Sequence, residues 1–298
     1  MNDVAIRLAG VRRTYPHFAL RDVSLEVPTG TITGFIGANG AGKSTTMRIV
    51  MGLIGHEGGS VEVLGREIPR EAPIAKREIG YVSEDMKLFP QATLQWHMDF
   101  IARAFGTWDA ACAASLLRRF DLKPAQKVRG LSHGQRIKAA LLLALARRPR
   151  LLVLDEPTTG LDPVARQEVI GALTEVVQDE ARTVLFSSQN TLDVEQVADR
   201  ITFIDRGRIV DADDTQAYLD RWRRVRLELP AGGAVPRIDH VVAAQADGRT
   251  AVVTTDRFSE AFLGMCQSAG ATVHAVDRMT LEEIFVAAVM ARREEVAR

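Results

Sequence analysis

Short apolar runs that end at glycines or at carboxylates recur through the N-terminal part of this 298-residue chain. Residues 31–36 have the β-branched and aromatic content of a short buried strand, and the residues from about Lys43 onward predict a helix. Residues 151–154 form a second buried run, followed at once by two carboxylates. The longest purely apolar stretch, residues 139–146, is far shorter than a membrane span of ~20 residues. We therefore expect a soluble protein that acts at a membrane only through a partner.

The pattern changes in the last part of the chain. Residues 241–245 and 250–255 predict two strands, and the Ala-Asp-Gly-Arg turn between them is a signal for a hairpin. A helix is expected near residues 259–270. These features predict a small α+β appendage. We expect a main domain at 1–220 and an accessory domain at 221–298.

The stretch Gly-Ala-Asn-Gly-Ala-Gly-Lys-Ser-Thr, residues 37–45, directly follows the first predicted strand. Its spacing matches the G-x-x-x-x-G-K-S pattern of a phosphate-binding loop. The glycines let the main chain turn its amide groups inward, and the helix that follows adds its positive N-terminal end. Lys43 is expected to reach the β- and γ-phosphates of a nucleotide, Ser44 to offer its hydroxyl to Mg²⁺, and Thr45 to contact the α-phosphate side.

Two carboxylates stand where the second buried run ends. Ligands of open parallel sheets bind at the carboxyl ends of the strands, so Asp155 and Glu156 are expected to face the same phosphates. Asp155 is placed to hold Mg²⁺ through water, and Glu156 to polarise the attacking water as general base. A plain strand end with acidic turn residues is the alternative, which the preceding phosphate loop disfavours.

A third stretch indicates a family. Leu-Ser-His-Gly-Gln-Arg, residues 131–136, precedes Asp155 by about twenty residues and opens a helix. Together with the phosphate loop, Leu-Leu-Val-Leu-Asp-Glu-Pro and Gly-Leu-Asp-Pro, it resembles the signature of ATP-binding cassette (ABC) proteins over residues 4 to about 215. The resemblance implies the α/β fold of a P-loop NTPase, with a RecA-like core, an antiparallel β portion and a helical subdomain at about 86–148. The last part of the chain resembles the C-terminal extension of exporter-type (ABC-2-like) cassettes that pair with separate membrane subunits.

The resemblance implies the motor subunit of an ABC transporter, which is an ATPase that dimerises around two MgATP and drives a separate polytopic permease, here for export. The partner cassette would be a second copy of this chain or a paralogue. The protein would lie in the cytoplasm, on the inner face of the cell membrane, held there by its permease. The permease is expected near residues 84–90 and the helical subdomain, and Leu88 and Phe89 are candidates there for either an exposed or a core role.

The nucleotide site implied by the resemblance draws on both subunits. Ser132, Gly134 and Gln135 would contact the γ-phosphate held by the other subunit, and Asp162 would couple the two sites. Tyr15 matches the aromatic residue that stacks on adenine, with a half-buried strand aromatic as the alternative. The expected nucleotide-binding residues are Tyr15, Gly37, Asn39, Gly40, Ala41, Gly42, Lys43, Ser44, Thr45, Ser132, Gly134, Gln135 and Asp162.

Three positions depart from the family pattern. His133 stands where glycine is usual, which an outward-pointing side chain would allow. Glu84 stands where glutamine is usual near Mg²⁺ and the attacking water, and a carboxylate can still ligate the metal. Gln189 occupies the place of the switch histidine that touches the γ-phosphate, and its amide donates a hydrogen bond but carries no charge. We therefore expect slow hydrolysis. The expected catalytic residues are Glu156, Gln189 and Glu84, and the expected metal ligands are Ser44, Asp155 and Glu84.

The charge balance bears on the class of binding partner, and the cysteine content bears on the redox setting. The 38 Lys and Arg residues balance 38 Asp and Glu residues, so no global field favours nucleic acid, and none is expected as a partner. Residues 118–150 nevertheless contain ten basic residues and one acid. A solvated helical face and a surface facing phosphates or lipid headgroups both explain that run. Cys112 and Cys266 lack metal-ligand spacing, which fits a reducing setting with both side chains buried.

Two other functions are compatible with part of the pattern. A soluble, non-transport cassette of translation or DNA repair would normally carry two cassettes in one chain or a long coiled coil, and neither feature is present in the sequence. A regulatory nucleotide-binding cassette with weak hydrolysis is suggested by Gln189 and His133. ATP turnover with and without the permease would distinguish that cassette from a motor.

Overall fold

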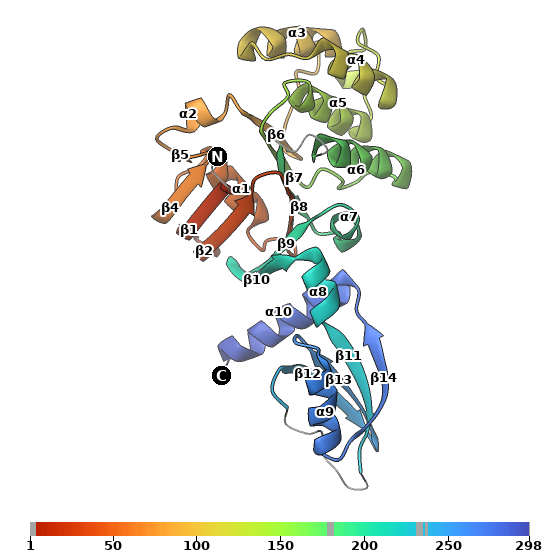
Figure 1. Ribbon diagram of the computed structural model, residues 1–298. Coiled ribbons are helices and arrows are strands. Elements are labelled where there is room, and N and C mark those ends of the chain that lie inside the picture. The colour runs from red at the N-terminus through yellow and green to blue at the C-terminus, as the bar shows by residue number, and fades with distance from the viewer. Residues whose placement is uncertain (1–3, 178–181, 231–234, 236–237, 298) are drawn as a thin grey trace. The chain divides into compact units, whose positions relative to one another are not determined.

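The computed structural model describes residues 4–177, 182–230, 235 and 238–297, and it divides into two compact units, 1–209 and 210–298 (Figure 1). The second unit begins earlier than the expected residue 221. The carboxylates of Asp211 and Asp213 pair with Arg221 at 2.6 and 3.2 Å, so the residues just before 221 belong with it. The two units are described separately below.

A six-stranded sheet forms the centre of the first unit. Its strand order is β10(Arg208–Asp214), β9(Arg200–Asp205), β3(Ile32–Ile36), β8(Thr183–Ser188), β7(Leu151–Asp155) and β6(Ile79–Ser83), and β10 runs past the unit boundary at residue 209. Neighbouring strands from β9 to β6 run parallel. β3, β7 and β8 are buried along their whole length, as expected for a parallel sheet covered on both faces.

The register of this sheet brings the carboxyl ends of its strands into line. Ile36 at the end of β3 pairs with Ser188 of β8, and Asp155 at the end of β7 pairs with Ser187. On the other side of β7, Asp155 pairs with Ser83 at the end of β6. Segments that are far apart in the sequence therefore leave the sheet at one edge.

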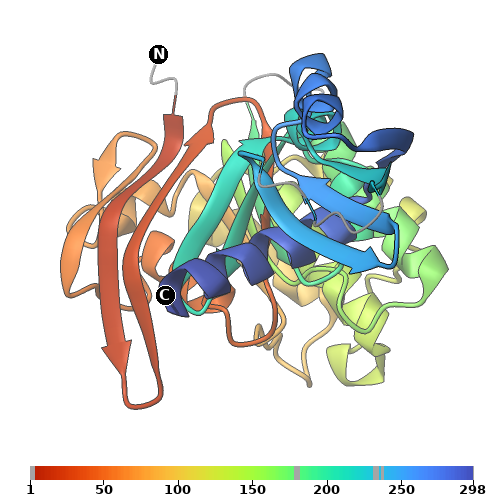
Figure 2. The same ribbon diagram turned by 90° about the horizontal axis from the view of Figure 1, so that it is seen from below.

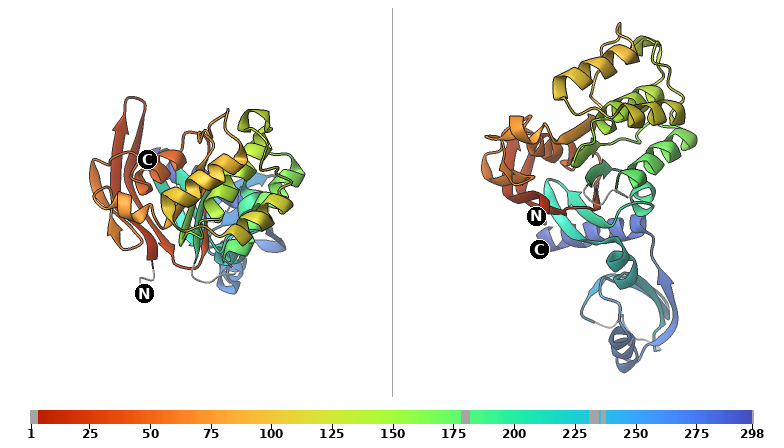
Figure 3. Two further views of the ribbon diagram at one scale, coloured as in Figure 1. Left: turned by 90° about the horizontal axis from the view of Figure 1, so that it is seen from above. Right: turned by 45° about the horizontal axis from the view of Figure 1, so that its top comes forward.

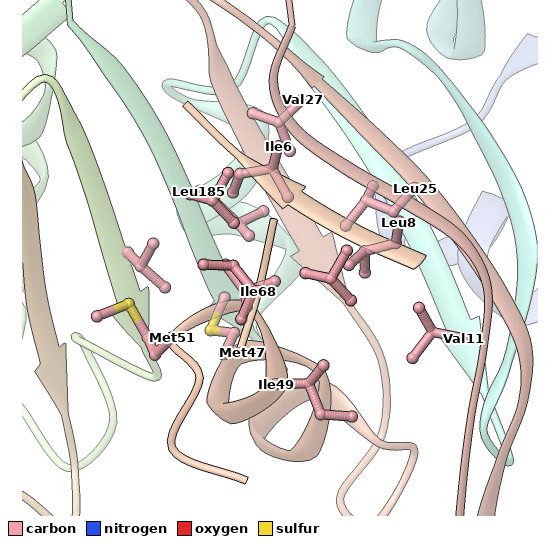
Figure 4. Close-up of a cluster of buried hydrophobic side chains, with 14 of the residues drawn as sticks. Ile6, Leu8, Val11, Leu25, Val27, Met47, Ile49, Met51, Ile68 and Leu185 are labelled. Atoms are coloured by element: carbon pink, nitrogen blue, oxygen red, sulfur yellow. The ribbon is translucent and has the colours of Figure 1, made fainter. Parts of the chain in front are cut away.

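An antiparallel sheet at the N-terminal side has the strand order β2(Phe18–Pro28), β1(Val4–Tyr15), β4(Gly58–Val63) and β5(Arg66–Glu67). Figure 2 shows β1 and β2 as two long neighbouring strands. Their inward side chains, such as Ile6 and Leu25, pack with Met47 and Ile49 of the first helix, as Figure 4 shows. Leu185 of β8 belongs to the same cluster, so one apolar core joins the two sheets.

Helices cover the central sheet and extend from it. The helical elements of the first unit are α1(Lys43–Val50), α2(Ala72–Ala75), α3(Leu94–Phe105), α4(Ala110–Arg119), a 3₁₀ turn (Val128–Gly130), α5(His133–Leu145), α6(Pro163–Val177) and α7(Thr191–Glu195). α3, α4 and α5 lie together within the expected helical subdomain (Figure 3), and α5 also contacts β6. Cys112 in α4 is half-buried, not fully buried as expected.

The basic run at 118–150 is not one continuous solvated face. Arg147 is buried, and its guanidinium donates to the carbonyls of Lys76, Arg77 and Ile79. Burial lowers the pKa of Arg147 to about 10. Four further members form ion pairs: Arg119 with Glu175, Lys138 with Glu168, Arg148 with Asp109 and Arg150 with Glu78.

The second unit is a small antiparallel sheet with helices. Its elements are α8(Thr215–Arg221), β11(Arg223–Glu228), β12(Val241–Asp247), β13(Thr250–Thr255), α9(Glu260–Ser268), β14(Thr272–Arg278) and α10(Leu281–Ala297), and the strand order is β12-β13-β11-β14. The expected hairpin is confirmed, because Asp247 pairs with Thr250 across the turn at Gly248. Val225, Phe262 and Cys266 belong to its apolar core, so Cys266 is buried as expected.

Within the part of the chain that the structure describes, no helix combines the length and the apolar character that are required to cross a membrane.

Candidate nucleotide site

The loop between β3 and α1 depends on glycine at two positions. Gly42 has a φ of +114°, and a Cβ atom there would lie 2.7 Å from Leu20 Cδ2. A Cβ atom on Gly37 would lie 2.5 Å from the carbonyl oxygen of Ile204. A side chain at either position would thus force the loop apart. α1 begins at Lys43 without a side-chain N-cap, so its first amide groups are not satisfied by such a cap and can face an anion.

Lys43 places a buried positive charge at this loop. Its side chain is 5% exposed, and Nζ donates to the carbonyl oxygens of Gly37 at 2.6 Å and Ala38 at 3.3 Å. Nζ also lies 3.0 Å from Glu156 Oε1 as an ion pair. The loop and the end of β7 therefore meet around this ammonium group, as the predicted roles of Lys43 and Glu156 require.

Two hydroxyl groups converge on Asp155. Ser44 Oγ donates to Asp155 Oδ1 at 3.1 Å, and Ser187 Oγ donates to the same oxygen at 2.8 Å. A serine hydroxyl and one carboxylate are suitable ligands for Mg²⁺, which binds through few protein oxygens together with substrate phosphates. The described residues contain no cluster of three or more His, Cys, Asp or Glu side chains that would form a cation cage on their own. The donor set at Ser44 and Asp155 thus fits Mg²⁺ held jointly with a nucleotide.

Glu156 is held in an unusual backbone conformation, and its two carboxylate oxygens have different partners. Its φ is +55°, in the left-handed region that non-glycine residues rarely adopt, and such strain is concentrated at functional sites. Oε2 accepts from Thr159 Oγ1 at 2.9 Å and from the main-chain N–H of Gln189 at 3.4 Å. Oε1 is buried and faces the Lys43 ammonium at 3.0 Å. If Lys43 moves to a bound anion, this oxygen can take a hydrogen bond from a water molecule.

The structure separates two of the expected catalytic residues from this arrangement. Gln189 follows β8 and approaches Glu156 through its main chain, while its side chain is exposed. Glu84 lies one residue beyond β6, is exposed, and has no polar contact with Ser44, Asp155 or Glu156 among the described residues. The role of the Gln189 amide and the metal-ligand role of Glu84 therefore stay predictions.

Tyr15 lies at the end of β1 with 36% of its surface exposed. Its ring stacks on Phe18 at 6.5 Å between centroids, and the guanidinium of Arg13 lies 5.2 Å from its centroid. Phe18 in turn lies beside the phosphate loop, since a Cβ atom on Gly42 would come within 2.9 Å of its ring. An exposed aromatic ring is therefore linked to the loop, as an adenine contact would need.

Of the remaining loop residues, some are packed in the interior and others are exposed. Ala41 is buried, and its N–H donates to the carbonyl of Ala38 at 3.1 Å. Asn39 and Gly40 are exposed, and Gly40 has a φ of +76°. Thr45 lies in the first turn of α1 and is half-buried.

The signature residues form the start of α5. Ser132 and Gln135 make a capping box, in which Ser132 Oγ accepts from the N–H of Gln135 at 3.2 Å and Gln135 Oε1 accepts from the N–H of Ser132 at 3.0 Å. The hydroxyl hydrogen of Ser132 is not used in this box and can point at an anion. Gly134 packs closely, because a Cβ atom there would lie 3.3 Å from Leu161 Cδ2. No described contact joins these residues to the phosphate loop of the same chain.

Asp162 caps the start of α6 with its carboxylate. Its Oδ1 accepts from the N–H groups of Val164 at 2.9 Å and Ala165 at 3.0 Å. The N–H of Ala165 contributes most to holding the pKa of Asp162 below its usual value. Its predicted role in coupling two subunits is not visible in one chain.

Sequence reasoning missed Ser187 and Thr159, which bond Asp155 and Glu156. The parallel register between β7 and β8 would have indicated Ser187, because the two strands start in line at Leu151 and Thr183, and Ser187 is the fifth residue of β8, as Asp155 is of β7. Thr159 follows Glu156 by three residues, and only the turn after β7 brings its hydroxyl back to the carboxylate.

Comparison with known proteins places this site in a family. The profile of the ABC transporter family matches residues 20–159. The daunorubicin resistance ATP-binding protein DrrA3 of Streptomyces coeruleorubidus is 34% identical over 96% of this chain and 96% of its own length. The Nod factor export ATP-binding protein I of Paraburkholderia xenovorans is 32% identical over 70% of each chain. A solved ATP-binding subunit of an ABC transporter superposes with a TM-score of 0.65 at 26% identity, over 70% of this chain and 90% of that one.

Proposed function

Because this chain belongs to the ABC transporter family, we propose that it is the ATP-binding and ATP-hydrolysing motor subunit of an export-type transporter. The observation that supports this most is the convergence of three groups at the carboxyl edge of the sheet: the Lys43 ammonium, the Ser44–Asp155 pair and the Glu156 carboxylate, whose Oε1 is paired with Lys43. Together they offer charge neutralisation, metal binding and a general base, which phosphoryl transfer to water requires.

Nucleotide binding would replace contacts that Lys43 makes within the protein. Its ammonium group is held by two loop carbonyls and by Glu156, and the phosphates of ATP would compete for it with greater negative charge. Ser44 and Asp155 would hold Mg²⁺, which neutralises charge on the phosphates when bound. Tyr15 would stack on the adenine ring.

Hydrolysis would then rest on the position of Glu156. Once Lys43 turns to the phosphates, Oε1 of Glu156 can accept the hydrogen of the attacking water and take its proton. The hydroxyl of Thr159 and the N–H of Gln189 hold the other oxygen, so the carboxylate is oriented before water arrives. Such preorganisation is a main source of catalysis in phosphoryl transfer.

A second cassette would complete the site. Ser132 keeps a hydroxyl hydrogen for an anion, and no described contact brings it to the phosphate loop of its own chain. We therefore assign its anion to the γ-phosphate bound by a partner cassette, which is this chain again or a paralogue. ATP would favour the closed dimer because it contacts both subunits only in that state.

The export assignment rests on the names of relatives, and the permease assignment rests on an apolar groove. The names of two relatives state daunorubicin resistance and Nod factor export. The groove has a volume of about 300 Å³ and lies between the end of β6, α3 and α5. Phe89, 61% exposed, and Phe100, 51% exposed, stand at its rim. His97 holds the segment that carries Phe89, since the N–H of Phe89 donates to His97 Nε2 at 3.0 Å.

We propose that this groove receives a cytoplasmic helix of the permease, which would hold the protein at the inner face of the cell membrane. An amphipathic helix fits because the groove lining is mostly apolar and aromatic. The non-transport alternative offers no occupant for the exposed Phe89, and the regulatory alternative is compatible with the groove but not with a prepared general base.

Phe89→Ser tests the permease assignment. We expect it to remove the stimulation of ATP turnover by the reconstituted permease while basal turnover stays within about twofold, because Phe89 lies in the groove and outside the phosphate site. Ile74→Ser is the matched control, since Ile74 is 46% exposed on α2 and does not line the groove. Equal stimulation of Phe89→Ser and wild type would contradict the docking site, and absence of any turnover in the wild type with and without permease would contradict the motor.

Gln189→His tests how much the absence of an imidazole at this position slows ATP hydrolysis. A charge-assisted hydrogen bond contributes ~1.5–3 kcal/mol, so its absence from the transition state slows hydrolysis roughly ten- to hundredfold. We expect slow but measurable turnover in the wild type and faster turnover in Gln189→His, measured as phosphate release at saturating MgATP.

The Glu84→Gln variant, combined with Gln189→His, decides whether Glu84 and Gln189 compensate for each other's departure from the family pattern. No described contact joins Glu84 to Gln189, so we expect the gain from Gln189→His to be the same in the Glu84→Gln background. A gain that disappears in the double variant would show that the two residues act as a pair in the closed dimer.

A further inference from the structure

We propose that His133 is a positioning residue that ties the signature segment of this chain to the general base of the same chain. The inference rests on the proposed function, which makes Glu156 the general base and Ser132 a contact to the nucleotide of the partner cassette. His133 would thereby link two nucleotide sites: the partner's site, which its neighbour Ser132 contacts, and its own site, which Glu156 serves.

The contact itself is a hydrogen bond from the ring to the main chain. His133 is the first residue of α5, and its Nε2 lies 3.1 Å from the carbonyl oxygen of Thr159. A carbonyl only accepts, so the ring must donate from Nε2, which requires the proton on that nitrogen. His133 is exposed, as the sequence allowed, yet its Nε2 reaches the segment that follows Glu156.

The segment around Thr159 is shaped to receive the ring. Gly160 has a φ of +71°, and a Cβ atom there would lie 3.2 Å from His133 Nε2. Beside it, Gly134 packs on Leu161 with equally little room. The start of α5 and residues 159–161 thus form a tight contact, in which a shift of one segment must move the other.

Thr159 carries this contact on to the base. Its carbonyl accepts from His133, while its hydroxyl donates to Glu156 Oε2 at 2.9 Å and its N–H donates to the Glu156 carbonyl at 3.3 Å. Fixing the main chain of Thr159 therefore fixes the hydroxyl that orients the carboxylate. Glycine, which is usual at position 133 in the family that the sequence resembles, has no side chain to make this bond.

The direction of the linkage follows from the neighbours of His133. Ser132 and Gln135 lie on either side of it in the same capping box, so an anion bound at Ser132 acts on a helix start that His133 connects to Thr159. When a partner's γ-phosphate engages Ser132, the position of Glu156 in this chain is set at the same time. Hydrolysis at one site would thus depend on occupancy of the other.

The experiment uses full-length variants and measures kcat, KM and the Hill coefficient for MgATP. We expect His133→Ala to lower kcat about two- to tenfold, the effect of one lost hydrogen bond, with KM within about twofold and a Hill coefficient closer to one. His133→Gln keeps a donor of similar reach and should recover part of kcat. Thr159→Val keeps the carbonyl and removes the hydroxyl, and adding His133→Ala to it should cause no further loss.

Three outcomes would overturn the proposal: His133→Ala with wild-type kcat and Hill coefficient, loss of kcat in His133→Ala without recovery in His133→Gln, or multiplicative losses in the double variant. Thermal unfolding of each variant, compared with wild type, shows whether a lost kcat reflects a damaged fold, and the His133→Gln comparison stays decisive in that case. Wild-type turnover in Glu156→Gln would instead refute the general base of the proposed function, which separates the two failures.

Discussion

Glu156→Gln should bind MgATP like the wild type and hydrolyse it at least about a hundredfold more slowly, since a positioned general base contributes ~10²–10⁴ in rate. An amide cannot take a proton from water. Ser44 and Asp155, which fit the metal, keep their contacts with each other and with Ser187 in this variant. Phosphate release at saturating MgATP measures the loss.

Glu156→Gln also tests whether the protein forms an ATP-bound dimer. With ATP bound and hydrolysis blocked, we expect the closed state to persist and to elute from gel filtration as an ATP-bound dimer, while wild type returns to monomer as ATP is consumed. Glu156→Asp is the matched control, because it keeps a carboxylate but withdraws it from Thr159 and Gln189. Wild-type turnover in Glu156→Gln would move the base elsewhere, with Glu84 as the next carboxylate along the edge of the sheet.

Lys43→Ala should lower ATP affinity by at least about a hundredfold, because two charge-assisted contacts of ~1.5–3 kcal/mol each are lost at the β- and γ-phosphates. The amide groups of the loop remain, yet they carry only partial charges and should not compensate. Calorimetric titration with MgATP measures the change.

The change to Lys43 has a second physical effect that a control must separate. Removing the ammonium leaves the buried Glu156 carboxylate without its ion pair, which disfavours the folded state. A thermal unfolding curve shows whether the variant is still folded at the titration temperature. Lys123→Ala, at an exposed lysine of the basic run, should bind ATP normally. Unchanged affinity in folded Lys43→Ala would contradict the assigned phosphate cradle.

Several positions of the candidate site could be predicted from local sequence alone. The phosphate loop could be recognised because glycine at 37 and 42, a lysine at 43 and a strand before them are all local requirements of an anion-binding turn. Asp155 and Glu156 could be placed at the site because carboxyl ends of parallel strands share one edge. These inferences need only the strand period, turn chemistry and a topological rule, which neighbouring residues encode.

Other features depended on how distant segments pack. The sequence placed Gln189 by its side chain, whereas the structure brings its main-chain N–H to Glu156 and leaves the side chain exposed. It grouped Glu84 with the metal ligands, but the structure leaves this residue exposed, one residue past the end of β6. The sequence placed the start of the second domain at 221, whereas the structure divides at 209, and the ion pairs of Arg221 with Asp211 and Asp213 could not be read from a local pattern.

The contact between His133 and Thr159 shows most plainly what the sequence determines and what only the tertiary structure decides. From the sequence, His133 was only a departure from a motif, and Thr159 was one of two threonines in a turn. Their hydrogen bond spans 26 residues and exists because α5 and the turn after β7 pack against each other in the folded unit. Residue type and spacing determined which chemistry the chain can perform. The tertiary structure decided which groups orient that chemistry, because orientation depends on distances between segments that the local pattern does not encode.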